Sequence, residues 1–223
     1  MTDGITLEVC IENGTRIEEL AAKGADRVEL NDNMAVGGTT VSYGVAEDAI
    51  RRCHAAGIKV MSMIRPRGGN FVYNETEFAV MTRDIEMLSG LGTDGYVFGC
   101  LTESGSLDRE KIIWLASVAV SSGGSDVELV FHMSFDHINP SEQIESLRWL
   151  ADSGITRILT HGSPDQGTPI QNNYRRLREY IAAANSPGES AIEILVGGGV
   201  TKDNYREICA ELQLTQAHGT KIL

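Results

Sequence analysis

Short apolar runs alternate with amphipathic segments along this chain of 223 residues. The apolar runs are rich in β-branched and aromatic residues and have the length of buried strands. They predict eight strands, at residues 5–11, 27–31, 59–66, 95–101, 128–135, 157–162, 193–200 and 215–222. No two of these runs are close enough in the sequence to form a hairpin. We therefore expect parallel pairing through crossover connections.

The segments between the strands have the spacing of one-sided helices. Apolar residues recur at i, i+3 and i+4 over residues 74–92 and 173–184, and glycines end the predicted helices at 15–24 and 139–154. The alternation predicts a single domain over residues 1–223, an α/β protein with a TIM-like (β/α)8 barrel. No eighth helix is visible after the last strand. An open doubly wound sheet is the alternative, but no GxGxxG motif follows the first strand.

Composition and charge narrow the class of partner. The net charge of −12 argues against nucleic acid, because phosphate backbones recruit clusters of lysine and arginine. The four cysteines, Cys10, Cys53, Cys100 and Cys209, are scattered and form no CxxC pair, which favours a reducing cytoplasm. No signal peptide is visible, and the longest apolar stretch, 112–120, falls short of the roughly 20 residues that span a bilayer. We expect a cytoplasmic protein with no membrane partner.

Alternation along the strands places ionisable residues on one face. Glu8, Glu29, Arg65, His132 and Asp136 share that face on four of the predicted strands. In a barrel this face lines the interior, and active sites lie at the C-terminal ends of the strands. Buried charges need a partner, a metal or water, so the convergence predicts a site. If the protein is an enzyme, Glu8 or Glu29 is the candidate base and His132 the acid, with Asp136 orienting His132.

Two features near the predicted barrel mouth could hold an anion. Arg65 and Arg67 precede two glycines where the third strand ends, and paired arginines suit a carboxylate or phosphate. They could equally neutralise Glu8 and Glu29. A glycine run ends the seventh strand, where barrel proteins often bind phosphate through backbone N–H groups, although glycines also serve tight exits. The run consists of Gly197, Gly198 and Gly199.

Sulfur and imidazole groups suggest a second chemistry. Soft sulfur ligands select Cu(I), and several sulfur-bearing residues could face the interior, namely Cys10, Cys100, Met61 and Met63. Methionine and free cysteine are also common core residues, so this reading has a structural alternative. His161 and His218 end two further strands and could bind a ligand or carry a proton. Our candidate metal ligands are Cys10, His132 and His161.

Several segments together resemble the copper homeostasis protein CutC family. They run over nearly the whole chain, and "IRPRGG" followed by "FVY" is the most specific block; the others are "GADRVEL", "AVGGTTVSYG", "LGTDGYVFG", "FHMSFD", "RILTHG", "GGGV" and "HGTKI". The resemblance implies a TIM-like barrel, a cytoplasmic location and a role in copper handling. It also adds Lys221 to the residues of a polar cavity. Many relatives have cysteine where this chain has Asn31, and its absence weakens a thiolate site on the second strand.

Two hypotheses about function follow. The first is a cytoplasmic copper homeostasis protein that binds a copper ion, as Cu(I), through Cys10 and nearby soft or imidazole ligands. The second is a TIM-barrel enzyme that acts on a small anionic metabolite, phosphorylated or carboxylated, held by Arg65 and Arg67 with help from the glycine run and Lys221. Under either, we expect a homo-oligomer, a dimer or tetramer, in which a partner molecule could complete the barrel.

Overall fold

The predicted strands all form in the computed structural model, which describes residues 4–188 and 190–223. Their bounds are β1 Thr6–Glu12, β2 Arg27–Asn31, β3 Lys59–Met63, β4 Gly95–Phe98, β5 Glu128–Phe131, β6 Arg157–Thr160, β7 Glu193–Val196 and β8 Gln216–Gly219. From β3 onward the strands end two to four residues earlier than predicted. The residues beyond these ends turn away into loops, which build the C-terminal face of the barrel.

Helices follow the first seven strands. Their bounds are α1 Ile17–Lys23, α2 Tyr43–Ala55, α3 Glu75–Gly90, α4 Arg109–Gly123, α5 Gln143–Asp152, α6 Tyr174–Ala184 and α7 Tyr205–Leu212. Local sequence explains where they begin and end: Asn74 and Glu77 form a reciprocal cap at the start of α3, and Gly24 ends α1 with a φ of 83°. No helix among the described residues is long and apolar enough to cross a membrane.

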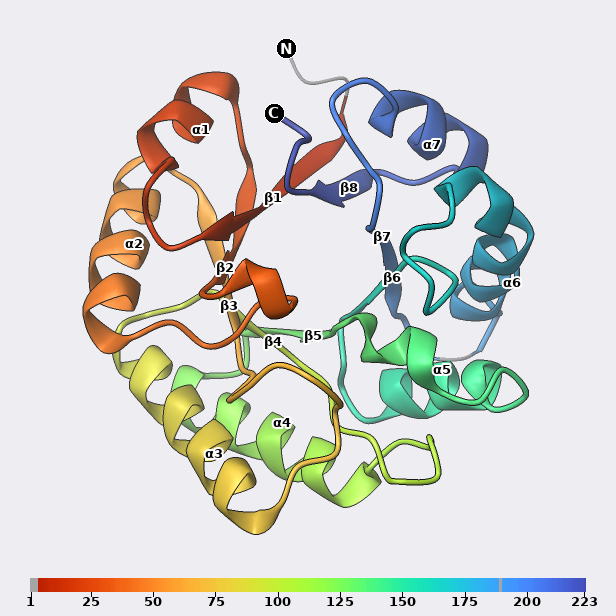
Figure 1. The fold of residues 1–223 in the computed structure, drawn as a ribbon, viewed down its shortest axis with the longest axis horizontal. Coiled ribbons are helices and arrows are strands. Elements are labelled where there is room, and N and C mark those ends of the chain that lie inside the picture. The colour runs from red at the N-terminus through yellow and green to blue at the C-terminus, as the bar shows by residue number, and fades with distance from the viewer. Residues whose placement is uncertain (1–3, 189) are drawn as a thin grey trace.

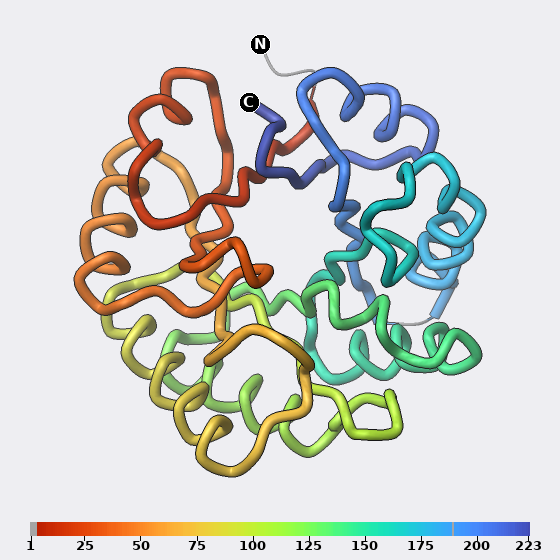
Figure 2. The backbone as a smooth tube through the Cα atoms, viewed as in Figure 1, coloured from red at the N-terminus to blue at the C-terminus, as the bar shows by residue number. Residues whose placement is uncertain are grey.

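The strands form one parallel sheet in the order β7-β6-β5-β4-β3-β2-β1-β8. The sheet curls into a ring with the helices outside it, as Figures 1 and 2 show in a view along the barrel. This confirms the TIM-like barrel, and within the described residues there are seven α-helices rather than eight. The C-terminal end of the chain lies between α7 and α1, where a further helix would complete the ring (Figure 1).

The barrel has one seam, between β7 and β8. Within the described residues, no hydrogen-bonded ladder joins these two strands. The chain closes the gap beyond the strand ends, where Thr201 pairs with Lys221 and the N–H of Lys202 donates to the Lys221 carbonyl at 2.9 Å. A side chain at Gly219 would lie 2.4 Å from the Val200 carbonyl oxygen, so this crossing requires a glycine.

The strands bury two separate apolar groups. Alternate residues such as Val28, Leu30 and Phe131 pack between the sheet and the helices in the main core. A smaller cluster fills the barrel interior along β3 to β7 and consists of Met61, Met63, Val97, Val130, Leu159 and Leu195. Cys100 belongs to the main core, so the prediction that it could face the interior is wrong.

The interior alternation predicted for the fifth strand stops at Phe131. Residues Met133–His137 form a short 3-10 helix, η2, instead of continuing the strand. The prediction that His132 and Asp136 share one strand face is therefore wrong, because the chain turns between them. The imidazole Nδ1 of His132 accepts the N–H of Ser134 at 3.2 Å, which caps this helix.

Candidate functional site

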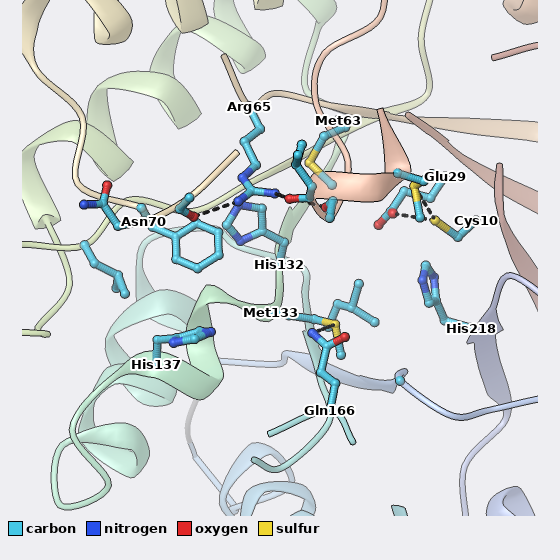
Figure 3. A pocket seen from close by; sticks show the side chains of 18 of the residues that line it. Cys10, Glu29, Met63, Arg65, Asn70, His132, Met133, His137, Gln166 and His218 are labelled. Atoms are coloured by element: carbon cyan, nitrogen blue, oxygen red, sulfur yellow. Dashed lines mark hydrogen bonds between the residues drawn. The ribbon is translucent and has the colours of Figure 1, made fainter. Parts of the chain in front are cut away.

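The C-terminal ends of the strands surround one large cavity of about 720 Å³. Its walls come from the strand ends and from the loops after β2, β3, β4, β5, β6 and β7. In Figure 3, Cys10, Glu29 and His218 lie together on one side of the cavity, apart from the group that contains Arg65 and His132. We call the first group the β1–β2–β8 wall and the second the Arg65–His132 wall.

The β1–β2–β8 wall brings three possible metal ligands together. Cys10, Glu29 and His218 are buried, and one ligand atom from each lies within 4.8 Å of the other two. The Cys10 thiol donates to Glu29 Oε1 over 3.4 Å. The second carboxylate oxygen, Glu29 Oε2, is buried and has no hydrogen-bond partner among the described residues. Such an oxygen is costly to bury and fits a cation or a donor from a ligand.

Two neighbours complete the surroundings of the Cys10 sulfur. The thioether sulfur of Met34, in the short helix η1 (Met34–Val36), lies 3.7 Å from Cys10 Sγ. Asn31 donates through Nδ2 to Cys10 Sγ at 3.4 Å and to Glu29 Oε1 at 2.9 Å. Asn31, at the end of β2, is therefore in direct contact with Cys10.

Below the wall, Glu8 holds His218 in place. Glu8 Oε1 pairs with His218 Nδ1 at 2.7 Å, and its other oxygen pairs with Arg27, which also donates to Gln216 Oε1 at 2.9 Å. Because Glu8 occupies Nδ1, Nε2 is the ring nitrogen left for a ligand. A carboxylate behind an imidazole is the usual way to orient a metal-binding histidine.

The charges of this group depend on one another. Burial favours the neutral forms, but Arg27 and His218 outweigh it at Glu8 and hold the pKa of that carboxyl at about 2. At His218, burial alone would lower the pKa, but the charges of Glu29 and Glu8 outweigh it and raise the pKa. At Cys10, burial and then the Glu29 carboxylate raise the pKa of the thiol well above its usual range. Cys10 is therefore a protonated thiol until something displaces its proton.

The Arg65–His132 wall combines a guanidinium group with a neutral imidazole, and both contact one aromatic ring. The Arg65 Nη groups donate to carbonyl oxygens of two loops, including Gly38 at 3.0 Å and Gly69 at 2.9 Å. The Phe71 ring lies 4.9 Å from the Arg65 guanidinium carbon and 4.9 Å from the His132 ring centroid. Burial and then the Arg65 charge lower the pKa of His132 to about 3, so this imidazole is neutral.

Three other predicted site residues, Arg67, Gly197 and Lys221, are not among the residues that line the cavity. The Arg67 guanidinium pairs with Glu77 and donates to the Val72 carbonyl at 2.8 Å, which ties down the loop after β3. The N–H of Gly197 donates to the Thr160 carbonyl at 3.0 Å, so it is not free to bind an anion, whereas Gly198 and Gly199 line the cavity. Lys221 lies at the barrel seam and is exposed.

Asp136 and His161 belong to a hydrogen-bonded turn rather than to the cavity wall. The Asp136 carboxylate accepts from Thr160 Oγ1 at 2.5 Å and from the N–H groups of His161 and Gly162 at 2.8 and 3.1 Å. Burial outweighs these bonds and raises the pKa of Asp136 to about 6. Both ring nitrogens of His161 face backbone carbonyls, at 3.0 Å for Gly198 and 3.1 Å for Thr168. Neither residue is among those that line the cavity.

Sequence reasoning missed two residues of the β1–β2–β8 wall and its support. Arg27 lies two residues before Glu29, so the alternation that selected Glu29 could have found it. Met34 lies in an irregular loop, where alternation gives no direction, and only the fold brings it to Cys10. His218 was one of two strand-end histidines, and the β1–β8 pairing of Glu8 with His218 distinguishes it from His161.

The fold and the site define a (β/α)8 barrel with a buried cysteine, histidine and carboxylate at the mouth of the barrel. Comparison with known sequences gives the particular family. A sequence model of the CutC family matches residues 5–223, and the chain belongs to that family.

Relatives span nearly all of this chain. The CutC family protein of Enterococcus faecalis is 45% identical over 216 residues, which cover 97% of this chain and 99% of the relative. The human relative, named copper homeostasis protein cutC homolog, is 33% identical over 97% of this chain and 73% of its own. The crystal structure of CutC from Streptococcus agalactiae superposes with a TM-score of 0.90 at 45% identity, covering 98% of this chain and all of that one.

Proposed function

We propose that this protein binds copper, as Cu(I), on the β1–β2–β8 wall and acts in copper homeostasis. One observation carries the proposal: a buried thiol, an imidazole and a carboxylate meet within 4.8 Å at the cavity, and one oxygen of that carboxylate has no hydrogen-bond partner among the described residues. Membership of the CutC family, with a human relative named for copper homeostasis, supports the choice of metal.

The donor atoms fit Cu(I) better than a hard cation. Cys10 supplies a sulfur, Met34 a thioether 3.7 Å from it, and His218 an imidazole nitrogen. Thiolate, thioether and imidazole are soft or borderline donors that suit Cu(I), whereas Mg²⁺ and Ca²⁺ prefer several oxygens. Glu29 offers the one carboxylate of the group, and we assign it to proton and charge balance rather than to the first ligand set.

Binding requires the Cys10 thiol to lose its proton. The Glu29 carboxylate already accepts the Cys10 S–H at 3.4 Å, so it is the group placed to pass that proton on to solvent. Loss of the proton replaces a neutral thiol by a thiolate in a buried site, which only a cation can balance. The site is therefore stable as a thiol when empty and selects a positively charged ligand.

An enzyme acting on a phosphorylated metabolite is less well supported. The Arg65 and Arg67 Nη groups, which would hold the phosphate, already donate to loop carbonyls and to Glu77. The N–H of Gly197 is used within the sheet. The arginine Nη groups and the Gly197 N–H, on which that hypothesis depends, are therefore already hydrogen-bonded within the protein.

A titration against a Cu(I) chelator tests the proposal. We expect Cys10→Ala to weaken Cu(I) binding by about 100-fold or more, because it removes the only thiolate of the set. Cys100→Ala is the matched control, since Cys100 is also buried but lies in the main core, away from the cavity. Equal Cu(I) affinity in the wild type and Cys10→Ala, or an equal loss in both variants, would contradict the proposal.

The cellular setting is proposed on the same basis. All four cysteines are free thiols, which suits the reducing cytoplasm that the sequence predicts. The homo-oligomer stays a prediction, and sedimentation of the purified protein measures it directly.

A further inference from the structure

The cavity is much larger than a metal ion requires. At about 720 Å³ it has the size of a site for a small organic molecule, and such sites are mostly apolar with a few placed polar groups. The β1–β2–β8 wall occupies only one side of this cavity. The rest of the lining is largely apolar and includes Phe71, Met63, Met133 and Leu159.

The Arg65–His132 wall contains two buried donors without acceptors. His132 and Arg65 are each 4% exposed, and both His132 Nε2 and Arg65 Nε lack a hydrogen-bond partner among the described residues. Because His132 Nδ1 accepts the Ser134 N–H, the ring proton of the neutral imidazole is on Nε2. A buried donor without an acceptor is costly, and two that contact the same Phe71 ring point to an acceptor that a ligand supplies.

Arg65 is also a buried positive charge that no acidic group neutralises. Its Nη groups donate to neutral carbonyls, and no ion pair to Arg65 occurs in the parts of the chain that the structure describes. Of the two carboxylates lining the cavity, Glu29 belongs to the opposite wall and Glu103 is exposed at the rim. An isolated buried charge is unfavourable, so a single negative charge brought by a ligand would be bound strongly.

We propose that the Arg65–His132 wall is a binding subsite for the carboxylate of a small molecule with an apolar body. One carboxylate oxygen accepts from His132 Nε2 and from Arg65 Nε, and the apolar body lies against the methionines and Leu159. The Phe71 ring, which contacts both donor groups, moves aside to admit the carboxylate. The subsite does not depend on copper binding, since it shares no residue with the Cys10–Glu29–His218 group.

Benzoate is a suitable probe, and benzyl alcohol is its neutral control. We expect saturable binding of benzoate to the metal-free protein by calorimetry, and at least about 10-fold weaker binding of benzyl alcohol, since hydrogen bonds to a charged group are the stronger ones. His132→Phe keeps an aromatic ring but removes the donor, and it should weaken benzoate binding by about 10-fold or more. His54→Phe, at an exposed histidine on α2 that does not line the cavity, should leave binding unchanged.

Two further measurements separate this proposal from copper binding and from misfolding. Cys10→Ala should bind benzoate as the wild type does, whatever its Cu(I) affinity. In wild-type protein with ¹⁵N-labelled histidine, benzoate should shift the His132 Nε2–H resonance and leave that of His218 unchanged. Absence of saturable benzoate binding, equal binding by His132→Phe, or a shift at His218 instead of His132 would each overturn the proposal.

Discussion

The two walls of the cavity differ in which of their buried polar groups are left unpaired. On β1, β2 and β8 the interior residues are charged or polar, and they neutralise one another through Glu8, Arg27 and His218. What is left over at the top is an acceptor, Glu29 Oε2, beside a thiol. On β5 to β7 a similar ion pair, Arg157 with Glu128 and Glu193, lies at the bottom of the barrel, but the interior layer above it is apolar along β3 to β7. What is left unpaired at the rim of this side is a pair of donors on Arg65 and His132.

This difference shows how one barrel can prepare a cavity for two unlike ligands. A surplus of acceptors with a soft sulfur favours a metal cation, whereas a surplus of donors with a buried guanidinium favours an anion. Alternation along the strands sets which residues point inward, but the pairing below the cavity decides which atoms remain unpaired. The ion pairs under the β1–β2–β8 wall are thus part of the site, although they touch no ligand.

The largest effect should come from breaking that support. Glu8→Gln leaves Arg27 and His218 without their carboxylate, and removal of one partner from a buried ion pair costs about 3–5 kcal/mol. Urea unfolding measures this change. Glu86→Gln, at an exposed position on α3, should change the free energy of unfolding by less than about 0.5 kcal/mol. Similar losses of unfolding free energy in both variants would contradict a stabilising role for the Glu8–Arg27–His218 network.

The pH dependence of Cu(I) affinity should come next. Binding needs a Cys10 thiolate and a neutral His218 Nε2, and the pKa of both groups is raised, so both bind protons that the metal must displace. Affinity should therefore rise with pH, by about 100-fold per unit below the pKa of His218 and about 10-fold per unit above it. Chelator competition at several pH values measures the slope. A slope unchanged by Cys10→Ala would contradict the role of the thiol.

A second thiol should strengthen the metal-binding wall only when it is placed there. Asn31→Cys sets a sulfur where Asn31 now contacts Cys10, and we expect Cu(I) affinity to rise by at least about 10-fold. Asn70→Cys adds a thiol to the lining near Arg65 and should leave the affinity unchanged (Figure 3). If both variants gain equally, the metal does not distinguish the two walls.

The smallest expected effect is a difference in Cu(I) affinity between substitutions of two methionines that line the same cavity. Met34→Leu removes the thioether 3.7 Å from Cys10 Sγ and should weaken Cu(I) binding by about 3- to 10-fold, because a thioether is the weakest donor of the set. Met133→Leu, in the loop after β5, changes a similar volume and should have no effect on Cu(I). Its sulfur accepts from Gln166 Nε2 at 3.4 Å rather than contacting Cys10. The same titration compares the two variants.

The fold was predictable because the strands are buried on both faces and each of the first seven is followed by a helix. The inward positions of Cys10, Glu29 and Met61 follow from a period of two, which holds as long as the strand continues. It failed at Asp136, where the chain leaves β5 and enters a 3-10 helix. Residues beyond a strand end obey loop geometry, and a sequence pattern carries no periodic signal there.

Burial alone could not assign roles to the predicted site residues. Arg65, Arg67 and His161 are polar residues near the strand ends, as predicted, yet most of their donors and ring nitrogens bind loop carbonyls. The same residue types would serve a ligand if those carbonyls lay elsewhere. Only the three-dimensional positions show that Arg65 Nε and His132 Nε2 are left unpaired.

X-ray absorption at the copper edge, on protein loaded with one equivalent of Cu(I), tests the metal-binding wall most directly. We predict sulfur neighbours together with one imidazole, with the imidazole contribution lost in His218→Gln and retained in His132→Phe. A first shell of oxygen and nitrogen without sulfur, or an imidazole contribution that disappears with His132→Phe and survives His218→Gln, would contradict the assignment of the metal to the β1–β2–β8 wall.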